Sequence, residues 1–317
     1  MVVEYILQAV GVFGIVYVGY RILKLSWNLF YPYVFGCTRN LKKLAGANVA
    51  VITGATDGIG KAFAFELAAK GFDLVLVSRT QSKLDQTAAD IGSAYDNIKV
   101  DTIAFDFSET NVDVYQEKLF NELDKYQIGV LVNNVGMAPE YPDILSELPY
   151  KEISNVLEIS ALPTTMLCAN VLKQMNNRHK GVVINVSSAA SKHTLAYWSV
   201  YSASKMYVNW LSAILRKEYS GSGITIQTLT PMMVATKMAK MDKTGLFVPS
   251  PAKYAKSALK TVGLANETSG YFFHQCQVEF GFKLAPGFVL DMLSGFESRK
   301  IKKRYLDNQR LLAQSQS

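Results

Sequence analysis

The distribution of apolar and polar residues divides the chain into three parts. Residues 5–20, YILQAVGVFGIVYVGY, form an uncharged run in which Gln8 is the one strongly polar residue. From residue 46 to about 270, short β-branched runs alternate with longer amphipathic runs. Residues 271–317 are rich in aromatic residues at first and basic later. We therefore predict an apolar helix and linker at 1–45, one large domain at 46–270 and a C-terminal apolar extension at 271–317.

The middle part predicts a parallel sheet covered by helices. Its apolar, strand-like runs are 48–53, 72–79, 98–106, 128–134, 181–188 and 223–231. Helical patterns lie between them at 59–71, 82–92, 109–126, 151–178 and 200–219. Strands that are apolar throughout are typical of a sheet buried on both faces. The predicted fold class is α/β, a doubly wound parallel sheet of the Rossmann type, in which ligands bind beyond the carboxyl ends of the strands.

The apolar run near the N-terminus predicts a membrane helix. It is slightly shorter than the ~20 residues that span a bilayer, and further apolar residues extend it. Glu4 precedes the run, whereas Arg21 and Lys24 follow it, so the positive-inside rule places the large domain in the cytosol. A cleaved signal peptide fits less well, because the start is not basic and no cleavage site stands out. The remaining alternative is a buried core helix, although the run precedes the large domain.

The formal net charge of +7 raises the question of anionic partners. The basic residues gather at 39–43 and 298–305, where no aromatic residues are interleaved and no nucleic-acid motif is present, so binding of nucleic acid is disfavoured. Cys37, Cys168 and Cys276 are too widely spaced to suggest a metal site or a disulfide framework. A reducing compartment and no metal are therefore expected.

The first candidate site is the glycine-rich segment TGATDGIG at 53–60, between a predicted strand and a predicted helix. Gly54 permits a tight turn, Gly58 lets the backbone approach a pyrophosphate, and Gly60 allows close helix packing. The spacing is GxxxGxG, and a purely structural turn is the alternative. The residues predicted to bind the dinucleotide here are Gly54, Thr56, Asp57, Gly58, Ile59 and Gly60.

The ends of the next strands indicate which dinucleotide is bound. The second strand ends in Ser78 and Arg79, where an NAD-binding protein commonly has an acidic residue for the ribose 2′-hydroxyl. A guanidinium binds a 2′-phosphate, so NADP(H) is favoured over NAD(H). Asp106, after the third strand, is a candidate contact for adenine or a turn residue. Asn133 and Gly136, in NNVG after the fourth strand, are predicted to brace the sheet edge and to leave room for the cofactor.

Tyr201 and Lys205, in SVYSASKMYV at 199–208, lie four residues apart and share a helix face. This spacing fits a phenolic proton donor beside a cation. The same spacing also occurs in an ordinary helix start with two surface neighbours, so these residues alone do not decide between the two interpretations.

Together, TGxxxGIG, NNVG, NVSS, YSASK and a proline after the following strand resemble the short-chain dehydrogenase/reductases over about residues 46–270. NNVGM at 133–137, AKSALKTVGL at 255–264 and the apolar N-terminus are similar to a membrane-bound group within that family. That group comprises the 17β-hydroxysteroid dehydrogenases of types three and twelve and the very-long-chain 3-oxoacyl-CoA reductases.

The resemblance implies catalytic roles for four residues. Tyr201 would donate a proton to a carbonyl oxygen, and Lys205 would lower the pKa of Tyr201 and hold the nicotinamide ribose. Ser188, thirteen positions before Tyr201, would steady the substrate oxygen, and Ser187 is the less favoured alternative. The family has an asparagine in the preceding helix, and ungapped counting places Ser160 there. A shift in the alignment would select Asn155.

Two further features follow from this comparison. Pro163 removes one helix hydrogen bond, so Ser160 and the carbonyl of Ile159 are predicted to share a relay water. The loop TPMMVATKM at 230–238 resembles the family's proline–glycine loop, with a methionine in place of the glycine. Pro231, Val234 and Thr236 would then meet the nicotinamide carboxamide.

The implied activity is NADPH-dependent reduction of a lipid ketone at the endoplasmic reticulum membrane, with the catalytic domain facing the cytosol. A 3-oxoacyl-CoA in fatty-acid elongation is favoured over a 17-ketosteroid, and a weakly catalytic scaffold of an elongation complex is the third reading. The Met- and Phe-rich segment after residue 238 is expected to line an apolar pocket, touch the membrane or pack in the core. A homodimer and elongation-complex partners are expected from the family, and His193 and His274 are expected to be structural.

Overall fold

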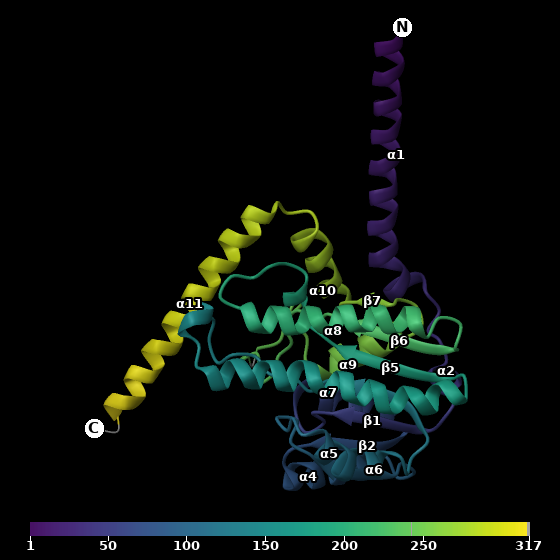
Figure 1. Cartoon of the computed structure of the whole chain (residues 1–317), viewed down its shortest axis with the longest axis vertical. Helices are drawn as coiled ribbons and strands as arrows, with labels where there is room; N and C mark the ends of the chain where they lie inside the picture. The colour runs from purple at the N-terminus through teal and green to yellow at the C-terminus, as the bar shows by residue number, and fades with distance from the viewer. Residues whose placement is uncertain (242, 316–317) are drawn as a thin grey trace.

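The computed structural model describes residues 1–241 and 243–315. A seven-stranded parallel sheet with the order β3-β2-β1-β4-β5-β6-β7 forms its centre (Figure 1). The strands are β1 (Val49–Thr53), β2 (Asp73–Ser78), β3 (Val100–Ala104), β4 (Ile128–Asn133), β5 (Gly181–Val186), β6 (Ile224–Leu229) and β7 (Glu267–Thr268). The α-helices are α1 (Val2–Phe30), α2 (Leu41–Ala45), α3 (Gly58–Ala68), α4 (Gln81–Ala94), α5 (Val112–Tyr115), α6 (Asn121–Leu123), α7 (Tyr150–Asn177), α8 (Ser199–Glu218), α9 (Pro251–Lys260), α10 (Phe272–Cys276) and α11 (Gly287–Ser315).

Short helical turns complete the description. Three are π-helical, η1 (Tyr31–Phe35), η2 (Gln116–Phe120) and η5 (Gln277–Phe282), and two are 3₁₀ turns, η3 (Leu145–Glu147) and η4 (Ala189–Ser191). All six predicted strands are present, each shorter than predicted by one to four residues. The predicted helix at 109–126 is present over 112–123 as the consecutive segments α5, η2 and α6, and its middle part is π-helical. The two-residue strand β7 was not expected, because so short a run carries no sequence period.

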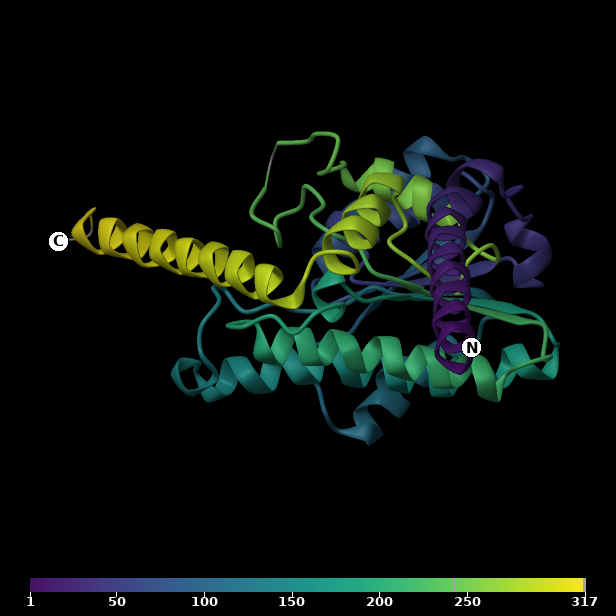
Figure 2. The ribbon, with the colours of Figure 1, turned by 90° about the horizontal axis from the view of Figure 1, so that it is seen from above.

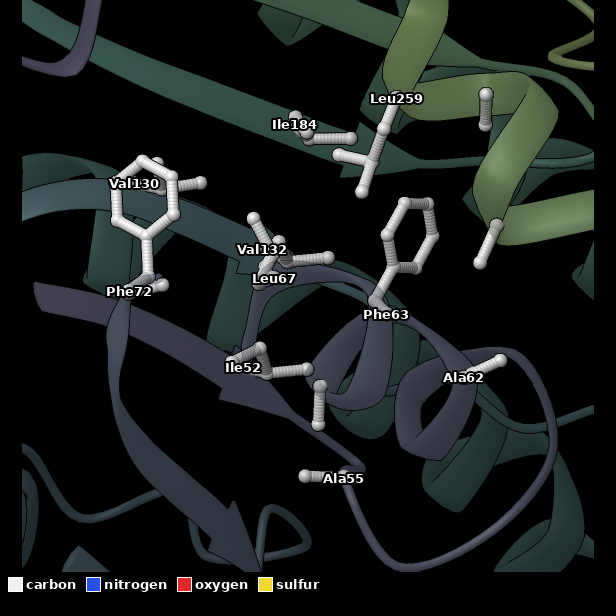
Figure 3. Packing of buried hydrophobic residues seen from close by; sticks show 14 of the residues in the cluster. Ile52, Ala55, Ala62, Phe63, Leu67, Phe72, Val130, Val132, Ile184 and Leu259 are labelled. Carbon is white, nitrogen blue, oxygen red and sulfur yellow. The ribbon is translucent and has the colours of Figure 1, made fainter. Parts of the chain in front are cut away.

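Helices cover both faces of the sheet, as the uniformly apolar strands predict. On one face, α3, α4 and α9 pack on alternate strand residues, and Figure 3 shows Phe63 of α3 next to Leu259 of α9, beside Val132 of the sheet. On the other face, α7 and the α5–α6 region cover the remaining strand residues, such as Val51 and Val183. Helices α7 and α8 lie side by side (Figure 2). Both clusters are buried, so the sheet is the middle of three layers.

The strand order fixes where a ligand can bind. The chain runs outward from β1 through β2 to β3, then returns to the other side of β1 with β4. The crossovers on the two sides of β1 therefore leave a crevice at the carboxyl ends of β1 and β4. The turn after β1 contains the glycine-rich segment, which places the first predicted site at this crevice.

The first helix, α1, and the last helix, α11, project from this body (Figure 1). Helix α1 is apolar and stands away from the sheet (Figure 1), and it is exposed along most of its length, with its base partly buried. By length and composition, Val2–Phe35 and Tyr150–Asn177 are long and apolar enough to cross a membrane, but the second of these is the partly buried α7 of the sheet layer. The corner between η5 and α11 projects to the same side as α1, and α11 then runs back along the body and away from it (Figures 1 and 2).

The base of α1 is bonded to the C-terminal region. Asn28 donates a hydrogen bond to Glu279 over 3.2 Å, and the hydroxyls of Tyr33 and Thr268 lie 2.5 Å apart. Glu279 is buried and also accepts hydrogen bonds from Gln275 (2.9 Å) and Lys283 (2.6 Å). These buried polar groups are therefore paired across segments about 250 residues apart in the sequence.

Candidate active site

The glycine-rich turn has the geometry of an anion cradle. Gly54 and Gly58 adopt φ values of +63° and +54°, which disfavour any side chain. A Cβ on Gly60 would overlap the carbonyl oxygen of Gly54, so only glycine fits there. Asp57 caps α3 by accepting the Gly58 N–H over 2.7 Å. The next amides, including that of Ile59, are at a helix start without intrahelical acceptors, and they suit a pyrophosphate.

The two asparagines of NNVG brace the sheet. Thr53 Oγ accepts the backbone N–H groups of Asn134 (2.9 Å) and Val135 (3.0 Å), and Asn134 donates back to the Thr53 carbonyl over 3.0 Å. Asn133 is buried and donates to Asn185 over 2.8 Å and to Cys168 over 3.3 Å. Its side chain therefore ties β4 to β5 and α7, and contact of Asn133 with the cofactor stays a prediction.

Arg79 is exposed at the end of β2 and has no hydrogen bond or ion pair with residues 1–241 or 243–315. The neighbouring hydroxyls of Thr56 and Ser78 lie 3.1 Å apart, between the glycine turn and β2. This polar corner leaves a guanidinium free for a 2′-phosphate. Asp106 takes the turn role: its carboxylate accepts the N–H (3.0 Å) and hydroxyl (2.9 Å) of Ser108. An adenine contact by Asp106 stays a prediction.

The structure brings Tyr201, Lys205 and Ser188 together at the carboxyl end of β5. Lys205 Nζ lies 5.9 Å from the centre of the Tyr201 ring and donates to the Val186 carbonyl over 3.4 Å. Gly136 faces the lysine: a Cβ on it would lie 2.7 Å from Nζ. Gly136 thus makes room for Lys205 itself, and the prediction that it makes room for the cofactor stays untested.

The ionisation of this group differs from the expectation. Burial raises the pKa of Tyr201, and its hydrogen bond with Ser188 opposes this shift without reversing it. Burial also lowers the pKa of Lys205 to about 8. The expected lowering of the Tyr201 pKa is therefore wrong for the protein alone, because burial of the phenol outweighs its hydrogen bond with Ser188. Tyr201 remains protonated at neutral pH, which is the form that donates a proton to a carbonyl.

Hydrogen bonds fix α8 against the segment after β5. Ser187 donates to the Lys205 carbonyl over 2.8 Å, so this serine braces the helix and Ser188 is the one beside Tyr201. Ser202 donates to the Ala190 carbonyl over 2.6 Å, and Asn209 to Ser191 over 2.7 Å. Sequence reasoning missed the bracing roles of Ser202 and Asn209, since a polar residue on a helix face carries no mark of its partner.

Ser160 lies close to the lysine from the neighbouring helix. Its hydroxyl is 3.8 Å from the Cβ position of Gly136, which itself is next to Lys205 Nζ. It accepts the Met137 N–H and donates to the Met137 carbonyl, each at 3.3 Å. The Asn155 side chain forms no hydrogen bond within residues 1–241 and 243–315. The geometry therefore favours Ser160 over Asn155, and Pro163 lies inside the continuous helix α7 as expected.

The loop after β6 reaches the glycine turn. A Cβ on Gly58 would lie 3.2 Å from Thr236 Cγ2, and Lys237 forms a 3.2 Å ion pair with Asp57. Val234 is buried in the core of the nucleotide-side face, and Pro231 accepts the Ala189 N–H over 2.9 Å. The loop therefore joins the two predicted sites, although contact of these residues with a carboxamide stays a prediction.

Helix α11 approaches the site from the substrate side. Ser298 accepts the indole N–H of Trp198 over 3.1 Å, and the Trp198 ring packs edge-on against Tyr201 with 6.0 Å between centres. Lys302 pairs with the buried Asp143 at 2.7 Å. A cavity of about 370 Å³ lies between α11 and the segments after β4 and β5. A second cavity, of about 630 Å³, lies between the base of α1 and the β6–β7 edge.

Comparison with known proteins gives a consistent picture. The family model described as "short chain dehydrogenase" matches residues 48–245. The chain is 50% identical over 295 residues to a very-long-chain 3-oxoacyl-CoA reductase of Caenorhabditis briggsae, covering 92% of this chain and 93% of the relative. It is 39% identical over 294 residues to the mouse very-long-chain 3-oxoacyl-CoA reductase, covering 91% and 92%. A Caenorhabditis elegans protein named as a putative steroid dehydrogenase is 46% identical over 293 residues, covering 92% of each chain.

A solved structure is similar as well. The short-chain dehydrogenase of Sphingobium yanoikuyae, in complex with NADPH, aligns with a TM-score of 0.60 and 29% identity, over 67% of this chain and 82% of that one.

Proposed function

Because this chain belongs to the short-chain dehydrogenase family, we propose that it is an NADPH-dependent reductase of ketones on lipid substrates. The family makes it an oxidoreductase that uses a nicotinamide dinucleotide. The glycine cradle, the open helix start and the unpaired Arg79 fit NADPH, which would supply the hydride when bound. The juxtaposition of Tyr201, Ser188 and Lys205 beside this cradle is the observation that carries the proposal.

Each residue then has one task. Ser188 holds the ketone oxygen by donating a hydrogen bond, which fixes the carbonyl next to Tyr201. Tyr201 gives its proton to that oxygen as negative charge develops on it. Lys205 places a positive charge near the phenolate that remains and offers donors to ribose hydroxyls. Ser160, beside Gly136 and Lys205, holds a water through which the proton is replaced from solvent.

The substrate class is proposed from two features. The relatives at 50% and 39% identity are very-long-chain 3-oxoacyl-CoA reductases, which favours a long-chain 3-oxoacyl-CoA reduced during fatty-acid elongation. Exposed apolar residues line α11 and the segment before it, and they suit a long acyl chain: Phe280, Leu284, Phe288, Met292, Leu293 and Phe296. A steroid ketone is the second candidate, favoured by the similarity to a protein named as a putative steroid dehydrogenase.

We also propose that α1 anchors the protein in the endoplasmic reticulum membrane with the reductase facing the cytosol. The support is an apolar, exposed helix followed by Arg21 and Lys24. The apolar corner between η5 and α11 lies on the same side as α1 and would meet the bilayer surface (Figure 1). Met206, Trp210 and Ile214 form an exposed apolar face on α8, which suits a homodimer or an elongation-complex partner.

NADPH oxidation by the purified full-length chain tests the activity. With a long-chain 3-oxoacyl-CoA we expect turnover, and Tyr201→Phe should lower kcat by about 100- to 10,000-fold because the proton donor is lost. Tyr219→Phe, at the end of the same helix, is the matched control and should keep full activity. A steroid ketone assayed in parallel decides between the two substrate classes. Unchanged turnover by Tyr201→Phe would rule out this mechanism.

A catalytically weak scaffold is the competing function, and Ser160 is the residue that favours it. Ser160→Asn restores the residue type that the family resemblance places at this position. If the serine holds the relay water well, kcat should change by less than about threefold, since both groups bind water. A large gain in turnover would mean that the native relay is defective, and no turnover on any ketone would favour the scaffold.

A further inference from the structure

The loop between β6 and α9 consists of an outgoing arm and a returning arm, which lie next to each other. The first arm, residues 231–236, carries the predicted nicotinamide contacts, and Thr236 lies against Gly58 of the glycine turn. The second arm, residues 245–250, leads into α9. One backbone hydrogen bond joins the arms directly, from the Ala235 N–H to the Pro249 carbonyl over 3.1 Å.

His274, on α10, binds both arms. Its Nδ1 lies 3.3 Å from the Met232 nitrogen, and its Nε2 lies 3.1 Å from the Met233 carbonyl oxygen and 3.2 Å from that of Phe247. The imidazole is fully buried. Met232 N–H can only donate and the two carbonyls can only accept, so Nδ1 must be the acceptor and Nε2 must carry the proton. Neutral His274 therefore satisfies every one of these backbone groups.

The position of the ring is itself fixed. The Tyr271 ring packs edge-on against the imidazole at 5.2 Å between centres. One residue further, Gln275 accepts the Ser269 N–H over 2.8 Å and donates to Glu279, which ties α10 to β7 and to the base of α1. Burial lowers the pKa of His274 to about 4, so the ring stays neutral at physiological pH. The neutral imidazole thus joins the two arms to α10, in addition to the contacts that each arm makes with the body of the protein.

We propose that His274 is a positioning residue for nucleotide binding: it clamps Met232–Met233 to Phe247 and so holds Val234 and Thr236 against the glycine turn. This inference rests on the proposed function in one respect, since it takes the nucleotide to bind at that turn. It goes further by assigning a task to a residue that touches neither the nucleotide cradle nor Tyr201. Loss of the clamp should weaken NADPH binding and leave the ionisation of the catalytic group unchanged.

Three substitutions separate the two halves of the clamp. His274→Phe keeps an aromatic ring and removes both the acceptor at Nδ1 and the donor at Nε2. His274→Asn places an amide oxygen near Nδ1, so it can still accept the Met232 N–H. His274→Gln places an amide N–H₂ near Nε2, so it can still donate to Met233 and Phe247. We expect the NADPH dissociation constant to rise at least about tenfold in His274→Phe and less in the two amide variants, which is partial rescue.

The readouts are NADPH binding by fluorescence and hydrogen–deuterium exchange of the full-length chain. Exchange in peptides covering 231–241 and 243–250 should speed up in His274→Phe, while β1 and β4 stay protected. The pH profile of kcat should keep its wild-type shape. Tyr254→Phe is the matched control, because its hydroxyl lies in the same buried region and has no partner among the described residues. It should behave as the wild-type chain.

Wild-type NADPH affinity and loop exchange in His274→Phe would overturn the proposal. If His274→Phe does not fold, the amide variants decide: equal loss of protection in the loop and in β1 would show a general structural role and overturn it as well. Loop exchange is measured without nucleotide, so it tests the clamp even if the wild-type chain fails to bind NADPH. That last result would contradict the proposed function and not the clamp.

Discussion

The nucleotide side and the substrate side of this crevice are built in different ways. On the nucleotide side, the cradle consists of consecutive residues, Gly54 to Gly60, whose shape follows from backbone φ values and one helix cap. On the substrate side, Tyr201 is packed against Trp198, which is held by Ser298 about a hundred residues later. The first kind of site depends on the absence of side chains, and the second depends on side chains that distant segments bring together. Substitutions should therefore act on them differently.

At the cradle, one substitution is expected to affect both folding and nucleotide binding. Gly60→Ala places a methyl group on the Gly54 carbonyl and near the Asn134 amide, where backbone must move. We expect a loss of about 1–3 kcal/mol in the free energy of unfolding and NADPH binding at least tenfold weaker, measured by thermal melting and by titration. Gly92→Ala, inside α4 with open space around it, is the control and should stabilise the protein by up to about 1 kcal/mol. Equal thermal stability and equal NADPH affinity of Gly60→Ala and Gly92→Ala would contradict the assignment of this turn as the nucleotide cradle.

We expect Lys205 to be needed for catalysis, but burying its charge should lower the stability of the folded protein. Its pKa of about 8 means that folding disfavours the charged form, so Lys205→Met should raise the free energy of unfolding by about 3 kcal/mol at pH 7 while abolishing turnover. Below pH 8, Lys205 is protonated in both the folded and the unfolded chain, so the stability difference between Lys205→Met and the wild type is constant. Between pH 8 and 10.5 the unfolded chain binds more protons, so wild-type stability rises with pH and the difference shrinks. Lys217→Met, exposed on the same helix, should show neither effect.

Arg79 tests nucleotide choice by charge alone. Arg79→Asp should raise the KM for NADPH about 10- to 100-fold, because a carboxylate repels the 2′-phosphate, and should improve the use of NADH. Lys83→Asp, on the exposed start of α4, makes the same change of charge nearby and should shift both values only slightly. Equal changes in the KM for NADPH in the two variants would mean that the preference for NADPH comes from the overall electrostatic field of this region and not from Arg79.

The smallest effect is expected on the substrate side. Ser298→Ala leaves the Trp198 N–H without its acceptor, at a cost of about 1 kcal/mol. The KM for the ketone should rise about fivefold, and the KM for NADPH should stay unchanged. Ser294→Ala, one turn earlier on α11, is the control, since among the described residues its hydroxyl bonds only to the carbonyl of Asp291 on its own helix. A rise in the KM for NADPH in Ser298→Ala would mean that the substrate side and the nucleotide side are not independent.

This difference also explains what the sequence could predict. The strands, the glycine turn and the pairing of Tyr201 with Lys205 follow from short-range patterns, and the structure has them where the pattern puts them. The roles of Asn133 and Ser187 depend on partners far away in the chain, and the pKa of Tyr201 depends on burial that no spacing reveals. His274 is the extreme case: its three partners are backbone groups, which look alike at every position.

The hydrogen bonds at the base of α1 have a practical consequence for anyone preparing this protein. Asn28 and Tyr33 hydrogen-bond directly to the buried Glu279 and Thr268 of the reductase, in addition to the bonds that these two residues make with Gln275. A shortened chain that starts after residue 35 would expose a carboxylate and a hydroxyl that the native fold keeps dry. The base of α1 and η1 are thus part of the folded reductase, and removing them to improve solubility would change the interior of that domain.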